Sequence, residues 1–308
     1  MSSSATGVGM TICFLGAILL ILTQKSSQKF GDVLGIMVFG GIPFYLSLIN
    51  AKESLVQNVD RLFFAQGGIM RSEFDELYNA LFSNADLYIS VVKGLAAHHD
   101  GMSREEISKA TGITGGTLTR VLTNLERCDF ISRNQNFAHK VKDTIYRLVD
   151  FYTLFYYKFI LSDVSGDEQW WSHHFESRQV STWQGLTFEI VCLMHTDSIK
   201  RALGISGMAT EVSSWRKAAT EGQNGGQIDL VIKRADRIIH LCEMKFSKSQ
   251  YRITEAYEQL LRQRLELFQS STRTKFSLVI TFVTTYGIAD GLHHSLVHRE
   301  VTMEQLFI

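Results

Sequence analysis

The sequence has little proline, no excess of charge of either sign and few cysteines. Its single proline, Pro43, excludes a proline-rich linker, and no internal repeat or low-complexity segment divides the 308 residues. Lysine and arginine together number 31, as do aspartate and glutamate, so the formal net charge is zero. This balance excludes a chain-wide basic field that would attract nucleic acid, although it permits a local basic patch.

The four cysteines, Cys13, Cys128, Cys192 and Cys242, are widely scattered along the chain. They form no Cys-x-x-Cys pair and do not have the spacing of a metal site, which argues against a disulfide framework and a cysteine-held metal. We therefore expect reduced thiols in the core of a cytoplasmic protein.

A long hydrophobic run is also missing. The most apolar stretch, residues 10–22, is shorter than the roughly 20 residues that a membrane-spanning helix needs, and no basic segment precedes it. A membrane is therefore not an expected partner, and a membrane anchor formed by residues 10–22 is the alternative to a cytoplasmic location.

The rest of the composition is typical of a globular protein. Apolar residues make up 45% of the chain and charged residues 20%, which is enough for a sizeable core. The length suits two domains. Segments of helical period and short β-rich runs occur in the same chain, which predicts the α+β class.

Two apolar runs of strand length, residues 226–232 and 238–246, are joined by a short basic turn and predict a hairpin. Each run carries one carboxylate, Asp229 or Glu243, and Lys245 follows Glu243 by two residues. Residues two apart on a strand share a face, so Glu243 and Lys245 point the same way. Paired carboxylates suit a hard divalent cation, and an ammonium group can orient or deprotonate a water for attack on a phosphodiester.

The segments around this hairpin predict the rest of a small domain. A helix is expected over residues 187–194, a first strand over 211–215, and a second helix over 254–269 that begins at the cap Thr254. A β-rich run over residues 276–284 predicts a last strand. The predicted order is helix, three strands, helix, strand.

This order, with an acid on one strand and Glu-x-Lys on the next, resembles the PD-(D/E)XK nuclease superfamily and its αβββαβ core. The resemblance implies that Asp229 and Glu243 bind Mg²⁺ or Mn²⁺ and that Lys245 assists the nucleophilic water. Glu189, on the first helix, resembles the additional acid that many members carry. The nuclease-like domain is expected over residues 184–308.

Two glutamines are weaker candidates. Gln227, beside the acid of the first strand, and Gln259, on the second helix, could contact substrate or metal-bound water, but polar residues in such places are commonly only solvated. The acidic motif also has a structural interpretation. Glu243 and Lys245 would then form an ion pair on a strand edge, and Asp229 would cap the hairpin.

Residues 81–150 predict a winged helix. Ser103 and Glu106 have the spacing of a capping box, and a glycine-containing turn separates the two helices that follow. The strands would pair as the wing. The predicted elements are helices over residues 86–97, 105–111 and 117–128 and strands over residues 130–133 and 144–148.

A winged helix suggests that DNA docks on the last of these helices. The residues expected to contact DNA are Thr117, Thr119, Arg120 and Asn124 in the groove and Arg133, Lys140 and Lys142 at phosphates. The alternative is a winged helix that serves as a packing module. Arg120 and Arg127 stand beside Glu126 and form no dense basic face, so the affinity for phosphates should be modest.

Three further segments extend the resemblance beyond the nuclease core. They are Gly40-Gly41-Ile42-Pro43-Phe44-Tyr45-Leu46, Asn58-Val59-Asp60-Arg61-Leu62-Phe63-Phe64 and Leu148-Val149-Asp150-Phe151-Tyr152-Thr153-Leu154-Phe155-Tyr156. The chain is thereby similar to the C-terminal portion of a prokaryotic AAA-type ATPase family. In that family a helical lid precedes a winged helix and a C-terminal domain of unknown function with the nuclease-like motif.

The departure from this family is the ATPase module itself. The sequence has no Gly-x-x-x-x-Gly-Lys-Ser/Thr loop, so we expect no nucleotide cofactor and no ATP hydrolysis by this chain. We interpret residues 30–80 as a lid remnant and residues 1–29 as an apolar segment foreign to the family, left by a truncated gene. An ATPase acting in trans is a possible partner.

Residues 151–183 are unusually rich in aromatic side chains. Stacking on unpaired bases is one use for them. The favoured interpretation is a helical connector whose aromatic residues supply buried area.

These observations predict a divalent-metal-dependent DNA endonuclease, or the nuclease-like effector part of a truncated AAA-type ATPase. The alternative is a non-catalytic DNA-binding or protein-docking module of an ATPase system. The sequence does not indicate DNA in preference to RNA, and it does not indicate an oligomeric state.

Overall fold

The computed structural model describes residues 26–137, 144–163, 165–219 and 225–307. The protein contains both helices and two β-sheets, which confirms the predicted α+β class. The chain divides into two compact units, one made of residues 1–133 and 145–186 and the other of residues 134–144 and 187–308. In the part that the structure describes, no helix is both long and apolar enough to cross a membrane. Residues 10–22 lie outside that part.

The first unit begins with a group of helices. Ser54 opens α4 with a capping box, in which its side chain accepts from the backbone of Gln57 and the Gln57 side chain accepts from the backbone of Ser54. Pro43 occupies the first turn of α3, where its missing N–H is no loss. The elements are α2 (Ser26–Phe39), α3 (Pro43–Ser47), α4 (Leu55–Val59), the π-helical turn η1 (Asp60–Phe64) and α5 (Ile69–Leu81).

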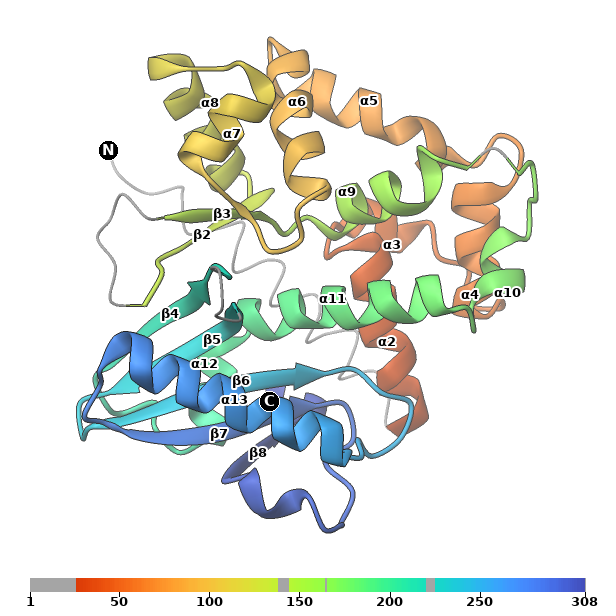
Figure 1. Ribbon diagram of the computed structural model, residues 1–308. Helices are drawn as coiled ribbons and strands as arrows, with labels where there is room; N and C mark the ends of the chain where they lie inside the picture. The colour runs from red at the N-terminus through yellow and green to blue at the C-terminus, as the bar shows by residue number, and fades with distance from the viewer. Residues whose placement is uncertain (1–25, 138–143, 164, 220–224, 308) are drawn as a thin grey trace. The chain divides into compact units, whose positions relative to one another are not determined.

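The next segment forms three helices and a small sheet (Figure 1). Ser103 and Glu106 make the predicted capping box at the start of α7, and Gly112 ends that helix with a φ of 73°. Strand β3 lies between β1 and β2 in the sheet. The elements are α6 (Ala85–Ala96), β1 (Met102–Ser103), α7 (Arg104–Thr111), α8 (Gly115–Arg127), β2 (Ile131–Asn134) and β3 (Ile145–Leu148). All of the predicted helices and strands of this region are present, and β1 was not predicted.

The aromatic segment is built from α9 (Phe151–Phe155), the π-helical turn η3 (Tyr156–Ile160) and α10 (Trp170–His174). Phe155 is fully buried, and its ring lies 4.7 Å from that of Phe63 and 5.1 Å from that of Trp171. Trp183 is also buried against Phe155. These residues therefore act as core, as the packing interpretation predicts, and are not available to stack on bases.

A carboxylate is buried inside this aromatic core. Asp60 is 6% exposed and accepts hydrogen bonds from the backbone N–H groups of Trp171 and Ser172 and from the Ser172 hydroxyl. The side chain thus satisfies the free N–H groups at the start of α10. Burial raises the pKa of this carboxyl, although each of these hydrogen bonds lowers it.

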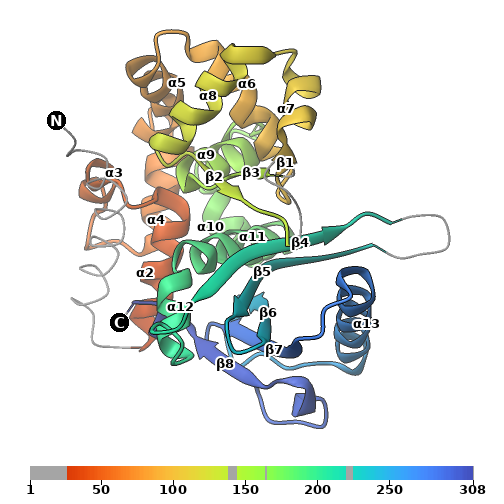
Figure 2. The same ribbon diagram turned by 90° about the vertical axis from the view of Figure 1, so that its left-hand side faces the viewer.

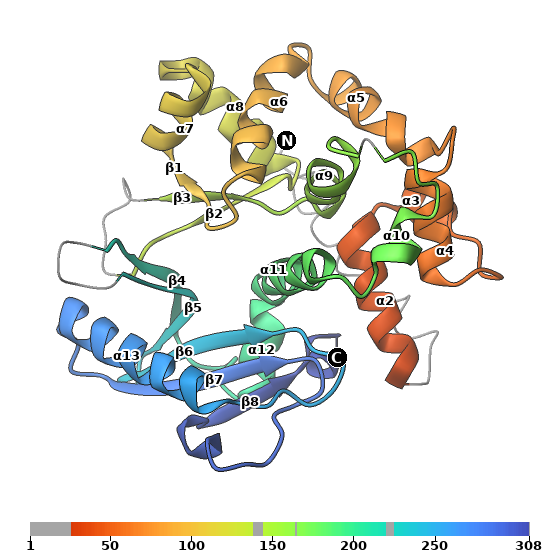
Figure 3. The same ribbon diagram turned by 45° about the vertical axis from the view of Figure 1, so that its right-hand side comes forward.

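The second unit is a five-stranded sheet with helices on both faces. Its elements are the residues of α11 (Arg178–Met194) from Thr187 on, α12 (Thr196–Ala202), β4 (Thr210–Lys217), β5 (Gly226–Arg234), β6 (Ile238–Lys245), α13 (Glu255–Thr272), β7 (Ser277–Thr284), the 3-10 turn η4 (His294–Leu296), β8 (Arg299–Thr302) and the 3-10 turn η5 (Met303–Phe307). The strands follow one another in the order β4-β5-β6-β7-β8 (Figure 3). Pairing is antiparallel from β4 to β6 and parallel from β6 to β8. The sequence predicted every strand except β8.

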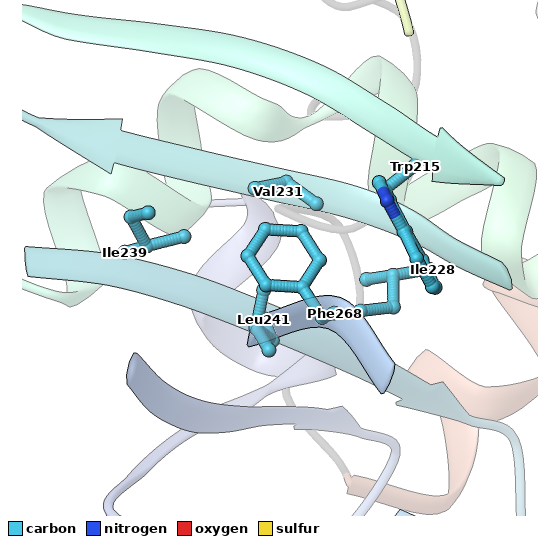
Figure 4. Packing of buried hydrophobic residues seen from close by; sticks show 6 residues of the cluster. All are labelled: Trp215, Ile228, Val231, Ile239, Leu241 and Phe268. Atoms are coloured by element: carbon cyan, nitrogen blue, oxygen red, sulfur yellow. The ribbon is translucent and has the colours of Figure 1, made fainter. Parts of the chain in front are cut away.

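Helix α13 covers one face of this sheet and α12 lies on the other (Figures 1 and 2). Phe268 of α13 is fully buried in the centre of an apolar cluster with residues of three strands (Figure 4). The strand residues of this cluster are Trp215, Ile228, Val231, Ile239 and Leu241. Phe137, from the segment that follows β2, packs on Phe268 with a ring separation of 5.1 Å. This cluster fixes α13 against the β5–β6 pair and so positions the polar residues described next.

Candidate functional site

The β5–β6 pair brings the two predicted carboxylates to the same place. The last pair at this end of the ladder is Leu230 with Cys242, and Asp229 and Glu243 each lie one residue beyond it. Strand β5 continues along β4 from Gly226 to Ile228, where it has no pairing with β6. The acids therefore lie where β5 and β6 begin to part, at the end of their ladder.

Glu243 is 8% exposed, and both of its oxygens have partners. Arg264 donates from Nη1 to Oε1 over 2.7 Å, and the Tyr257 hydroxyl donates to Oε2 over 2.6 Å. The Nζ of Lys245 lies 3.8 Å from Oε2. Two cations and one hydroxyl thus surround a buried carboxylate, which needs such partners to remain ionised away from water.

Helix α13 supplies Tyr257 and Arg264 because they lie seven residues, or about two turns, apart and so share one face. Phe268 continues that face into the apolar cluster. The Thr254 side chain caps the helix by accepting from the backbone N–H of Tyr257, as predicted. A single helix face therefore provides both the apolar contact with the sheet and the two donors to Glu243.

The protonation states of these donors follow from their surroundings. Burial raises the pKa of the Tyr257 hydroxyl, and the charge and hydrogen bond of Glu243 raise it further, so Tyr257 stays a donor. Burial lowers the pKa of Arg264, but the charge and hydrogen bond of Glu243 outweigh this effect, and the pKa lies above its ordinary value. The charge of Asp229 acts on Arg264 in the same direction. Arg264 is therefore a permanent cation between the two acids.

Lys245 lies on the same side of β6 as Glu243, as the two-residue spacing predicts. Its Nζ is 4.9 Å from the centre of the Tyr257 ring, a distance suited to a cation–π contact. Met244, the residue between them, is buried. Lys245 is thus held between a carboxylate and an aromatic face, and its side chain remains 25% exposed.

The two glutamines have different surroundings. Gln227 is half-buried, and its Nε2 donates to Oδ1 of Asp229 over 3.0 Å. Gln259 is exposed on α13, two residues from Tyr257, which places it about 200° around the helix from that residue. The structure therefore brings Gln227 to the acids and leaves Gln259 on the opposite side of α13.

Glu189 lies on α11, half-buried and one turn before Cys192. Burial raises the pKa of the Cys192 thiol, and the nearby Glu189 and Cys242 raise it further, so this turn of α11 lies close to Cys242 of β6. Neighbouring residues on a strand point to opposite faces. Glu189 thus belongs to the face that carries Cys242, whereas Glu243 points toward α13.

A pocket of about 680 Å³ lies beside the acids, between the start of β5 and α13. Its lining residues are Gly225, Gly226, Gln227, Leu260, Gln263, Arg264, Glu266, Leu267 and Ser270. Gln227 and Arg264 therefore face the pocket and also bond the two acids. A Cβ at Gly226 would lie 2.9 Å from a methyl carbon of Leu267 and 3.1 Å from the ring of Trp215, so these side chains would have to shift to accept a larger residue.

The carboxylates of Asp229 and Glu243 are chemically suitable ligands for a hard divalent cation. Carboxylate oxygens are the ligands that Mg²⁺ and Mn²⁺ prefer, and Mg²⁺ is often held by only one or two carboxylates together with substrate phosphates. Among the described residues, no group of three or more acidic, histidine or cysteine side chains is placed to hold a metal. Asp229 and Glu243 would be the protein ligands, and a metal at Glu243 would share its oxygens with Arg264 and Tyr257 or displace one of these donors.

Some of the α8 residues predicted to contact DNA are exposed, and others are hydrogen-bonded within the protein. Thr117 and Arg120 are exposed. Thr119 is exposed, and its hydroxyl accepts from Arg104 over 2.9 Å. The Asn124 amide donates to the Tyr88 hydroxyl of α6 over 2.9 Å, so it holds two helices together.

Arg133, at the end of β2, is paired with Glu126, with 3.2 Å between Nε and Oε1. Lys140 and Lys142 lie outside the described residues. Thr117 and Arg120 are therefore the predicted DNA-contacting residues whose side chains are exposed and make no hydrogen bond or ion pair in the described part of the chain.

Sequence reasoning missed two residues of the site, Tyr257 and Arg264. Both lie on the helix predicted over residues 254–269, where no role was assigned to either of them. Arg264 lies two turns after Tyr257 on the same helix face, between Leu261 and Phe268, which are both buried. A charged residue on an otherwise apolar helix face was the available signal, because such a residue needs a partner from the surface on which the helix packs.

No protein-family model, no curated protein and no solved structure matches this chain. Its function must therefore follow from the site and the fold that holds it.

Proposed function

We propose that this chain is a divalent-metal-dependent phosphodiester hydrolase that acts on DNA as an endonuclease. Asp229 and Glu243 would hold Mg²⁺ or Mn²⁺, and Lys245 would act on the attacking water. Glu189, the predicted auxiliary acid, lies near Cys242 on the other face of the sheet and has no part in this metal site as we propose it. The observation that carries the proposal is the meeting of both carboxylates at the end of the β5–β6 ladder, with the Lys245 Nζ 3.8 Å from Glu243.

Hydrolysis of a phosphodiester needs a water that is oriented and deprotonated and an environment that accepts the growing negative charge. A divalent cation supplies Lewis acidity and charge neutralisation at such a centre. The Lys245 ammonium would orient the water by a hydrogen bond and stabilise the growing negative charge, and the proton of the water, made more acidic by the bound cation, would pass to solvent. Gln227 would orient Asp229 through its 3.0 Å hydrogen bond.

The arrangement of the second unit is consistent with a PD-(D/E)XK nuclease core. Its order is α11, α12, β4, β5, β6, α13 and β7, in which α12 is additional to that core, with the acid on β5 and Glu-x-Lys on β6. The parallel pairing of β6 with β7 places α13 as the crossover between them. This order supports the nuclease proposal without relating the chain to any particular member.

The first unit supports a role in DNA docking. We infer that α6, α7, α8 and the β1-β3-β2 sheet form a winged helix, with Thr117 and Arg120 facing the groove. Helices α2 to α5 would correspond to the lid of an AAA-type ATPase, whose catalytic part would act in trans. The pairing of Arg133 with Glu126 limits the charge that this unit can offer to phosphates.

The direct test is cleavage of supercoiled, linear and single-stranded DNA by the full chain in Mn²⁺ or Mg²⁺. We expect Lys245→Ala to abolish cleavage. The control is Lys275→Ala, which removes an exposed lysine of the same unit. Cleavage that survives in the Lys245→Ala protein would reject the assignment of Lys245 to the water.

One observation favours a second candidate, a non-catalytic module that binds DNA or docks on a partner. Both oxygens of Glu243 are bonded, to Arg264 and Tyr257, so the carboxylate is stable in this place without any metal. Calorimetric titration with Mn²⁺ separates the two candidates. If Asp229→Ala and Glu243→Ala bind Mn²⁺ as the unaltered chain does, the acids are structural and the second candidate holds.

A further inference from the structure

The charges around Glu243 are balanced without a metal. Asp229 and Glu243 contribute two negative charges, and Lys245 and Arg264 contribute two positive ones within the same cluster. Adding a divalent cation while both cations stay in place would leave an excess of two positive charges in a partly buried site. Such an excess is unfavourable unless a cation moves or an anion enters.

Arg264 is the cation of this cluster that lines the pocket. Its side chain is 30% exposed and lines the pocket beside β5, so the guanidinium borders open space as well as Glu243. Lys245 lies on β6, between Glu243 and the Tyr257 ring. Rotation of the Arg264 side chain would release Oε1 of Glu243 and turn the guanidinium toward the pocket.

The pocket suits a strand of nucleic acid. The amides of Gln227 and Gln263 and the hydroxyl of Ser270 offer hydrogen bonds, and Leu260 offers an apolar surface. Glu266 also lines the pocket and is the acidic group that an entering phosphate would meet. A guanidinium can form paired hydrogen bonds with either a carboxylate or a phosphate, so Arg264 can exchange one for the other.

We propose that Arg264 has two successive partners: Glu243 in the resting site, and a phosphate of the DNA strand in the pocket once the site is loaded. Arg264 thereby balances the negative charge of the acids when no metal is bound and couples metal binding to substrate binding. This inference rests on the proposed nuclease function, because it needs Asp229 and Glu243 to be metal ligands.

The first test is calorimetric titration of the full chain with Mn²⁺ alone. We expect Arg264→Gln to tighten Mn²⁺ binding about tenfold, because a competing charge-assisted hydrogen bond to Glu243 is removed. Arg264→Lys should give a smaller change. Arg262→Gln is the matched control, since it removes the same charge from the same helix at a side chain paired with Glu258.

The second test is the affinity for a fluorescent DNA oligonucleotide, measured by anisotropy in Ca²⁺ at constant ionic strength. We expect Arg264→Gln to weaken DNA binding about tenfold, Arg264→Lys to restore part of it, and Arg262→Gln to have little effect. Opposite changes in metal and DNA affinity are a result that a merely structural ion pair would not give. Thermal denaturation of each variant establishes that it is folded.

The outcomes separate the inference from the function on which it rests. Saturable Mn²⁺ binding that Asp229→Asn abolishes and Arg264→Gln leaves unchanged or weakens would overturn the role of Arg264 alone. Absence of Mn²⁺ binding in the unaltered chain and in both Arg264 variants would overturn the proposed function and the inference together. Weak binding that Arg264→Gln strengthens supports both.

Discussion

The first unit buries the carboxylate of Asp60 and the second buries that of Glu243, and the partners of the two are of different kinds. Asp60 in the first unit is 6% exposed and is bonded by two backbone N–H groups and a hydroxyl, all of them neutral. Glu243 in the second unit is 8% exposed and is bonded by Arg264 and Tyr257 with Lys245 nearby. Backbone donors are fixed by the helix that they begin, whereas side-chain cations can move. Similar burial therefore accompanies a cap of neutral donors in one unit and a cluster of charged side chains in the other.

The largest expected effect is on DNA cleavage, which should depend on Glu243 and not on Asp60. We expect Glu243→Gln to lower DNA cleavage by about 100-fold or more, because it removes one of two proposed metal ligands. Asp60→Asn should leave the rate for the folded protein unchanged. Initial rates on supercoiled DNA in Mn²⁺ measure both. Equal losses in the two variants would mean that cleavage reports only on folding.

The next largest expected effect is on stability, which should depend strongly on Asp60. Asp60→Ala leaves the N–H groups of Trp171 and Ser172 without their acceptor in a buried place, and we expect a loss of about 2–4 kcal/mol in the free energy of unfolding. Urea denaturation followed by tryptophan fluorescence measures it. Asp86→Ala, at an exposed position of the same unit, is the control. A loss below about 0.5 kcal/mol would show that Asp60 does not hold α10.

His240 in the second unit and Asp60 in the first should make contributions of opposite sign to the stability in acid. Burial and the nearby Arg234 and Arg299 lower the pKa of His240, in β6, to about 4. Arg234 donates toward Nε2, so Nδ1 carries the proton and donates to Thr281. A lowered histidine pKa stabilises the fold above the unfolded pKa of about 6.5, and this contribution is lost as the pH falls toward 4.

We therefore expect the second unit to lose about 2–3 kcal/mol between pH 6.5 and pH 4 through His240. His240→Gln should flatten this dependence. Asp60 acts with the opposite sign, because its raised pKa favours the folded state in acid, and the benefit disappears as the pH rises through the folded pKa. Denaturation curves at several pH values check both signs, and an unchanged slope in His240→Gln would exclude His240 as the cause.

The smallest expected effect is on DNA affinity, where the exposed Arg120 should matter less than the partly buried Arg264. Arg120 is exposed on α8, and we expect Arg120→Ala to weaken DNA binding only about threefold and equally for all sequences. Arg264→Gln should have a larger effect. A strong or sequence-dependent loss in Arg120→Ala would show that α8 reads bases and that the first unit contributes specificity.

Local signals in the sequence predicted much of the fold. Ser103 and Thr254 cap their helices as expected, because a cap depends on residues three positions apart. The hairpin of β5 and β6 follows from two apolar runs and a short turn. Strand β8 was missed because four residues, Arg299–Thr302, carry too short a pattern to recognise.

The partners of the site residues were harder to predict, because they come from distant segments. The bond from Arg264 to Glu243 spans 21 residues, and the bond from Asn124 to Tyr88 spans 36. The residues next to Asn124 in the sequence do not show whether its side chain faces DNA or α6. The packing of α8 on α6 decides this. The π-helical turns at Asp60 and Tyr156 likewise depend on the aromatic core around them.

The order of the strands has a consequence for how the acidic site assembles during folding. Strands β5 and β6 are antiparallel neighbours joined by the turn at Ala235 and Asp236, so their pairing needs only a short loop to close. Strand β7 pairs in parallel with β6 and can dock only after α13 has crossed the sheet. Asp229 and Glu243 should therefore meet before Arg264 arrives to neutralise them. A divalent cation present during refolding would find these acids without their guanidinium, and it could set the rate at which α13 docks.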